Sequence, residues 1–115
     1  MKDDIKQRWI AALRSGDYAQ GKGYLATGHK FCCLGVLCEL AVADVIINKY
    51  DDISNIRWYG NNYDEECTTL PAAVQRWAGL DSDDPYIETE ENTLAAINDA
   101  GYTFEQIANL IDSEL

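Results

Sequence analysis

Two adjacent cysteines, Cys32 and Cys33, lie where a short extended segment leads into an apolar helical run. At such a junction, backbone N–H groups and the helix dipole lower the pKa of a thiol and can create a nucleophile. A cysteine hydrolase also needs a base, usually histidine. The single histidine, His29, falls in a predicted turn, from which a strand would carry it away from the thiol. The sequence therefore favours the alternative, that these cysteines are small buried hydrophobes.

The spacing of the cysteines does not match a metal site. Cys32, Cys33 and Cys38 form no CxxC pair, and Cys67 is solitary. Residues 81–84 begin like a calcium loop, but the central glycine and terminal glutamate are missing at the required offsets. No segment directs the chain to an oxidising compartment. We therefore expect free thiols, no metal and no cofactor.

Several polar and aromatic side chains could instead bind a small anionic ligand. The segment 21–23, Gly-Lys-Gly, could bring backbone N–H groups and an ammonium to a phosphate, although it lacks the P-loop and dinucleotide patterns and could be a plain connecting loop. Asn98 and Asp99 could line a polar pocket, or could hydrogen-bond to the backbone of a helix corner. The candidate ligand-binding residues are Arg14, Tyr18, Gln20, Lys22, Cys32, Cys33, Asn98 and Asp99.

The formal net charge of -11 argues against binding to nucleic acid or to an anionic membrane, since either surface would repel the chain. The charge is also uneven. The last basic residue is Arg76, and residues 79–115 contain acids but no Lys or Arg. A protein partner with a basic face is one interpretation, and a solvated acidic surface that aids solubility is the other.

The 115 residues fit a single domain that needs no disulfide or metal to stabilise it. Hydrophobic residues make up 47% of the chain, which includes three Trp and seven Tyr, so the sequence is unlike a disordered one. The longest apolar run is much shorter than the ~20 residues of a membrane span, and no signal segment is visible. We expect one soluble domain, residues 1–115, that stays in the compartment where it is made.

The first half of the chain predicts helices around a short hairpin. Asp3 or Asp4 can cap a first helix that ends at residues 15–16, and the glycine-rich segment 16–23 predicts no regular structure. Residues 24–26 and 30–32 flank a Thr-Gly-His turn like two strands. Residues 34–48 predict a helix that is apolar nearly all round, which places it in the middle of the domain.

The second half predicts a strand at residues 56–59, a helix that begins at Pro71 and stops near Gly79, and an edge strand at 85–88. A short helix follows over 93–99. Thr103 and Gln106 have the spacing of a capping box and open a last helix. The predicted fold is thus α+β, a compact single domain of about four to five helices around a central buried helix, with a small antiparallel hairpin or sheet.

Four segments resemble a family of small, mostly uncharacterised proteins encoded by tailed bacteriophages, and together they span nearly the whole chain. They are WIAALRSGDY at 9–18 with Gln20, FCCLGVLCELA at 31–41, LPAAV with WAGL at 70–80, and LAAINDAG at 94–101 with FEQIA at 104–108. The resemblance brings no catalytic or cofactor assignment. It implies expression inside an infected bacterium, and hence the host cytoplasm.

Small phage proteins of this kind often act against host machinery or host defence, which suggests three functions. The first is a non-enzymatic, homo-oligomeric sponge that sequesters a nucleotide-derived signal through arginine, aromatic and amide groups. The second is an inhibitor whose acidic C-terminal third docks on a basic host protein. The third is a thiol-dependent enzyme that degrades the same signal. The polar residues repeated in the resembling segments favour the sponge.

Overall fold

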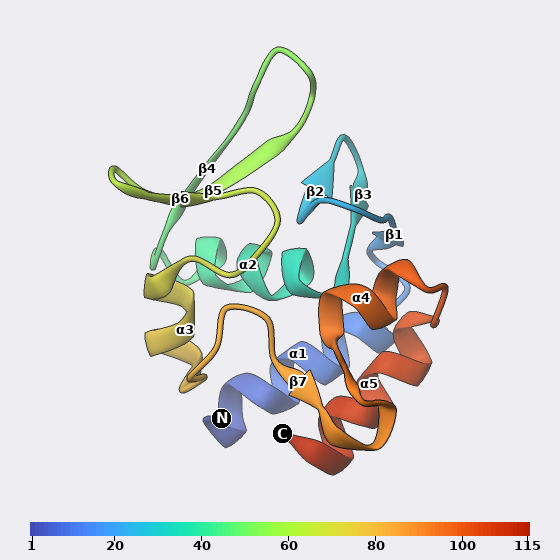
Figure 1. The fold of residues 1–115 in the computed structure, drawn as a ribbon. Helices are drawn as coiled ribbons and strands as arrows, with labels where there is room; N and C mark the ends of the chain where they lie inside the picture. Colours follow the sequence, from blue (N-terminus) through green and yellow to red (C-terminus); the bar gives the residue numbers. More distant parts are fainter.

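Helix α2 (Cys33–Ala43) runs through the middle of the structure, a computed structural model that describes residues 1–115 (Figure 1). The residues from Cys33 to Cys38 are all buried, as expected of a helix that is apolar on every side. The other helices are α1 (Asp3–Arg14), α3 (Ala72–Ala78), α4 (Leu94–Asp99), α5 (Phe104–Glu114) and the 3₁₀ turn η1 (Glu88–Glu90). The predicted α+β class, with five helices in one compact domain, is confirmed.

Helix α2 ends earlier than the sequence predicts. It stops at Ala43 and not near residue 48, because Val45 adopts a left-handed conformation with φ of 59°. The Ile46 N–H then donates to the Ala41 carbonyl and the Val45 N–H to the Val42 carbonyl, which is the Schellman arrangement that closes a helix. Glycine normally takes this position, so a valine there gave no stop signal in the sequence.

The predicted hairpin is confirmed by β2 (Ala26–Thr27) and β3 (Lys30–Phe31), which pair antiparallel. The glycine-rich segment before it is more regular than expected, because β1 (Ala19–Gln20) pairs in parallel with β3. The hairpin lies directly on α2. A Cβ added to Gly35 would be 1.8 Å from the Leu25 carbonyl oxygen, so only glycine permits this approach.

A second sheet has the order β4-β5-β6 and is antiparallel throughout. Its strands are β4 (Asn48–Asp51), β5 (Arg57–Asn61) and β6 (Asp64–Glu66), and the β4–β5 hairpin projects away from the helices (Figure 1). Only β5 was predicted. The Asp64 carboxylate accepts hydrogen bonds from the N–H groups of Ala72 and Ala73, and it thereby caps α3 from outside the helix.

The C-terminal third agrees closely with the sequence. The edge strand β7 (Tyr86–Ile87) is confirmed and pairs with β8 (Asn92–Thr93). The capping box of Thr103 and Gln106 is present at the start of α5.

At the N-terminus, the predicted aspartate cap of α1 is wrong. Asp3 and Asp4 lie in the first turn of the helix, and the N-cap residue is Lys2, whose side chain makes no capping hydrogen bond.

One hydrophobic core of 25 buried residues joins α1, α2, α4 and α5. Trp9 of α1 is fully buried, and its indole Nε1 donates to the Cys33 carbonyl at 2.9 Å. The α5 stripe of Phe104, Ile107, Ala108 and Ile111 is buried, largely against α1. None of the helices combines the length and the apolar character needed to cross a membrane.

Candidate functional site

Asn98, the last buried residue of α4, joins three segments that are far apart in the sequence. Its side chain is 0% exposed. Its Oδ1 atom accepts from Gln20 Nε2 at 2.9 Å and from the Cys33 N–H at 3.2 Å, and its Nδ2 atom donates to the Gly21 carbonyl at 2.8 Å and to Asp99 Oδ1 at 3.3 Å. We call these five residues the Asn98 network.

The Asn98 network uses the full hydrogen-bonding capacity of the asparagine side chain, two acceptor and two donor positions. Gln20 Nε2 also donates to the Tyr102 carbonyl at 2.8 Å, and Asp99 Oδ1 accepts from the Gly23 N–H at 3.0 Å. Four residues that the sequence proposed as ligand contacts, Gln20, Cys33, Asn98 and Asp99, therefore do meet in space. Their contacts hold the β1 loop, the start of α2 and the end of α4 together.

The thiols of Cys32, Cys33 and Cys38 are buried, and burial disfavours their ionised form. Burial raises the pKa of Cys32 to about 11 and outweighs the hydrogen bonds from the N–H groups of Gly35 and Leu34, which lower it. Burial also raises the pKa of Cys33 and of Cys38 well above the usual value. The prediction that Cys32 and Cys33 are small buried hydrophobes is confirmed by their burial, and desolvation at this junction exceeds the effect of the helix terminus on the thiol pKa.

The surroundings of the thiols are equally unsuited to catalysis. His29 is exposed in the turn of the β2–β3 hairpin, whereas Cys32 and Cys33 are in the core. Cys33 Sγ lies 3.7 Å from the Leu94 carbonyl oxygen, which is a weak acceptor contact and supplies no base. All four cysteines are free. No group of three or more His, Cys, Asp or Glu side chains is placed to hold a metal ion.

Of the other four candidates, Cys32 is buried in the core beside Cys33, and the remaining three make no hydrogen bond to the Asn98 side chain. Arg14 Nη2 donates to Asn109 Oδ1 at 2.6 Å, and Arg14 Nε forms an ion pair with Glu105 at 3.3 Å, so the guanidinium links α1 to α5. Tyr18 packs edge to face on Phe31 with 5.3 Å between ring centroids. Lys22 is exposed. The eight candidates do not form one ligand site.

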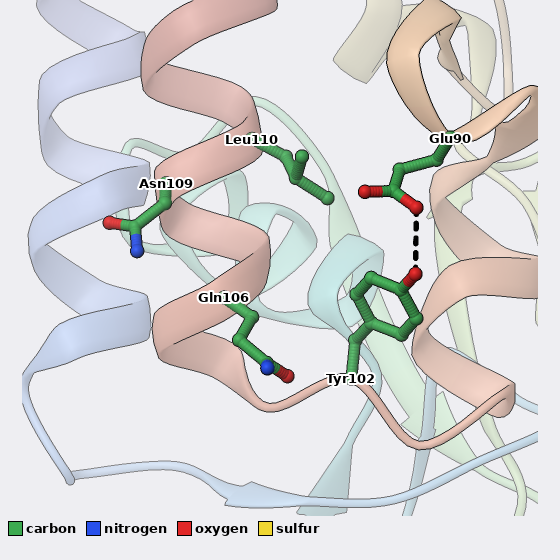
Figure 2. A pocket seen from close by; sticks show the side chains of 5 residues that line it. All are labelled: Glu90, Tyr102, Gln106, Asn109 and Leu110. Carbon is green, nitrogen blue, oxygen red and sulfur yellow. Dashed lines mark hydrogen bonds between the residues drawn. The ribbon is translucent and has the colours of Figure 1, made fainter.

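The cavity of the structure lies on the outer side of α5. None of the eight candidates lines it, although Arg14 and Gln20 hydrogen-bond to two of its lining residues, Asn109 and Tyr102. It has a volume of about 200 Å³ and is lined by Glu90, Tyr102, Gln106, Asn109 and Leu110. The Tyr102 hydroxyl donates to Glu90 Oε2 at 2.7 Å, and Figure 2 shows this pair facing Leu110 across the cavity. The hydrogen bond to the Glu90 carboxylate, with its negative charge, raises the pKa of Tyr102.

Sequence reasoning did not identify these five lining residues. Gln106 and Leu110 are four residues apart, so they fall on the side of α5 that the buried stripe leaves free, while Tyr102 lies two residues before the start of α5. An apolar leucine among polar residues on that side was the available signal. Glu90 comes from η1, and its place beside α5 depends on how the β7–β8 segment folds back (Figure 1).

The acidic excess of the chain lies in its C-terminal third, which also supplies all five residues that line this cavity. Residues 1–78 contain ten acidic and nine basic residues, and residues 79–115 contain ten acidic and no basic ones. The structure contains four ion pairs. Only one of them, between Arg14 and Glu105, involves an acidic residue of the C-terminal third. The last third forms one side of the domain, from β7 to α5 (Figure 1).

Comparison with known proteins gives a family without an assigned activity. No curated protein and no solved structure matches the chain. A family model described as a domain of unknown function, DUF8296, matches residues 1–115. Because that match covers the complete sequence, the chain belongs to the DUF8296 family.

Proposed function

We propose that this protein is a non-enzymatic binder whose acidic C-terminal third docks on the basic surface of another protein. The observation that carries the proposal is the separation of charge, since residues 79–115 hold ten acidic residues and no Lys or Arg. A field of one sign on one side of a small domain steers a protein of opposite charge and orients it during association.

The same observations make the sponge the weaker proposal. A nucleotide brings phosphate groups, and the cavity offers them a carboxylate, Glu90, and no basic side chain in its lining. Its volume of about 200 Å³ is also below the ~300–1,000 Å³ of pockets that bury drug-sized ligands. The amide groups of the Asn98 network are already paired within the protein.

A thiol-dependent enzyme is disfavoured by the burial of Cys32 and Cys33 and by the direction of their pKa shifts. The setting of the proposed activity is the cytoplasm of an infected bacterium. This part of the proposal rests on the resemblance of the four sequence segments to phage-encoded proteins. In that setting the partner would be a host protein with a basic face, such as one that handles nucleic acid.

Affinity capture from a bacterial lysate tests the proposal, with the tagged full-length protein as bait. We expect one specific basic protein at about 0.1 M salt and its release at about 1 M, where the screening length falls from ~10 Å to ~3 Å. Two triple variants provide the comparison. One neutralises exposed acids of the last third, Glu88→Gln, Glu91→Gln and Asp112→Asn, and the other neutralises exposed acids elsewhere, Asp3→Asn, Asp4→Asn and Asp17→Asn.

The two triple variants remove equal charge, so they separate a docking face from a general effect of net charge. Capture should fall in the first variant and persist in the second. Equal loss in both, or capture that does not respond to salt, would contradict the proposal. Mixing the purified protein with cyclic or ADP-ribose-type nucleotides tests the sponge in parallel, because a sponge lowers the free nucleotide and releases it intact on heating.

A further inference from the structure

The cavity beside α5 has two kinds of wall. On one side the Glu90 carboxylate is half-buried and oriented by the Tyr102 hydroxyl, which donates to Oε2. On the other side Leu110 points into the space from α5, with Gln106 one turn away (Figure 2). The cavity thus combines a fixed negative charge, an aromatic ring and an aliphatic side chain.

The acceptor atoms in this cavity are partly free. Glu90 Oε2 takes the Tyr102 hydroxyl, while Glu90 Oε1 has no partner within the protein. Gln106 Oε1 accepts one bond, from the Thr103 N–H at 2.9 Å, and retains a second lone pair. The Asn109 side chain is turned towards α1, where its Oδ1 accepts from Arg14 (Figure 2). A ligand would therefore meet acceptors on Glu90 and Gln106.

An arginine side chain matches this combination. Its guanidinium carries five donors in a rigid fork that pairs with carboxylates, and it stacks on aromatic faces such as that of Tyr102. Its aliphatic stem packs on apolar surface such as Leu110 while the charged head stays paired. A volume of about 200 Å³ suits one side chain and is too small for a larger ligand.

We infer that the cavity formed by Glu90, Tyr102, Gln106 and Leu110 is a binding site for the guanidinium of an arginine on a polypeptide partner. This inference rests on the proposed function and makes it more specific, because it gives the basic partner one anchoring side chain. Residues 79–115 contain no Lys or Arg, and Arg14, which reaches the lining residue Asn109 from α1, pairs with Glu105, so no basic side chain of the protein pairs with Glu90.

The test is a titration of the full-length ¹⁵N-labelled protein with a capped Gly-Arg-Gly peptide, followed by NMR. We expect shifts confined to the Gln106 side-chain amide and to the backbone signals around Tyr102 and Leu110. Glu90→Gln should weaken peptide binding about tenfold, as the loss of a hydrogen bond to a charged group implies. Glu66→Gln is the matched control, since Glu66 is also half-buried but lies in β6, and it should leave binding unchanged.

Two further ligands test whether the site recognises the charge of arginine, its aliphatic stem, or both. The same peptide with citrulline in place of arginine keeps the shape without the charge, and guanidinium ion keeps the charge without the stem. Both should bind more weakly than the arginine peptide. Equal binding of citrulline would overturn the role of charge, and equal binding of guanidinium would indicate a site for small cations and would overturn the assignment to a partner side chain.

The outcome separates this inference from the proposed function. Equal peptide affinity in Glu90→Gln and Glu66→Gln would overturn the arginine site, while salt-sensitive capture of a basic protein would still support the acidic docking face. A tenfold difference between these two variants, with no protein captured, would support the site and contradict the proposed function.

Discussion

The Asn98 network and the α5 cavity are both rich in polar side chains, yet they differ in how many polar atoms remain free. All four hydrogen-bonding positions of Asn98 are occupied by the protein itself. In the cavity, Glu90 Oε1 has no partner in the chain. The polar residues of the motif stabilise the fold, whereas the free acceptor of Glu90 lies at a residue that belongs to no motif. A polar group repeated in a motif is therefore not by itself evidence of a ligand.

The largest expected effect comes from Gly35, which lets the β2–β3 hairpin lie on α2 beside the Asn98 network. In Gly35→Ala the new Cβ would be 1.8 Å from the Leu25 carbonyl oxygen, a backbone atom that cannot move aside without separating hairpin and helix. We expect a loss of more than about 4 kcal/mol in the free energy of unfolding, or failure to fold.

Chemical denaturation measures the change in unfolding free energy caused by Gly35→Ala. Helix propensity alone would predict the opposite result, a gain in stability. Alanine in an unobstructed helix is more stable than glycine by roughly 0.5–1 kcal/mol. A gain of that size would mean that the hairpin does not contact α2 as described. Ala11→Gly, at an exposed position of α1, is a control for propensity alone and should lose about 1 kcal/mol.

The second-largest loss of stability is expected for Asn98→Ala, which removes the centre of the Asn98 network. Asn98→Ala leaves the buried Cys33 N–H and the Gly21 carbonyl without partners, and each orphaned group costs about 1–3 kcal/mol. We expect about 3 kcal/mol of destabilisation by urea denaturation. Asn109→Ala, on the exposed side of α5, should change stability by less than about 0.5 kcal/mol. Similar losses in both variants would remove the distinction between the two regions.

A third effect concerns pH, because the core that contains the network also contains three thiols. The pKa of Cys32 is raised to about 11 in the folded protein, against ~8.5 for a free thiol. Because this pKa is higher in the folded than in the unfolded state, the contribution of Cys32 to stability is fully present below pH ~8.5. It is lost as pH rises towards 11, since the thiol of the unfolded chain ionises first. Burial shifts Cys33, Cys38 and Tyr59 in the same direction.

We therefore expect a fall of at least about 3 kcal/mol in unfolding free energy between pH ~8.5 and 11, measured by urea titration at each pH, because Cys32 alone contributes about 1.4 kcal/mol per unit over ~2.5 units. Cys32→Ala removes one of the titrating groups, so its curve should fall less steeply over that range. An unchanged slope in Cys32→Ala would show that this thiol is not protected from ionisation by the core.

Much of the fold could be predicted from the sequence, because the signals are local. The apolar run of α2, the capping box of Thr103 and Gln106, and Pro71 before α3 all act within a few residues. The end of α2 could not be predicted, since Val45 adopts a conformation that glycine usually supplies. Strands β1, β4, β6 and β8 were missed because each has only two to four residues, too few for a clear alternation of apolar and polar side chains.

The site was less predictable than the fold. The sequence identified Gln20, Asn98 and Asp99 as polar residues worth attention, and they do meet. Whether their atoms are free depends on the backbone groups of Gly21 and Cys33, which no side-chain pattern reveals. The cavity depends on η1 reaching α5, a tertiary contact, so its acceptor atoms could not be anticipated from spacing.

The smallest effect on stability is expected at the cavity itself, in Tyr102→Phe. This substitution removes the hydroxyl that donates to Glu90 Oε2 and keeps the ring. The denaturation midpoint should change only slightly, because the bond is part-buried and water can replace the lost partner of Glu90. Binding of the arginine peptide should weaken about threefold, since the freed carboxylate must be immobilised on binding. Tyr63→Phe, at a fully exposed loop position, should alter neither property.

A fall in the denaturation midpoint of Tyr102→Phe as large as that of Asn98→Ala would place Tyr102 among the structural residues and would contradict the division between network and cavity. Weaker peptide binding at unchanged stability would support it. The pairing of these two measurements matters because Tyr102 belongs to both regions, its carbonyl accepting from Gln20 while its hydroxyl holds Glu90. The backbone of one residue thus serves the fold, and its side chain serves the site.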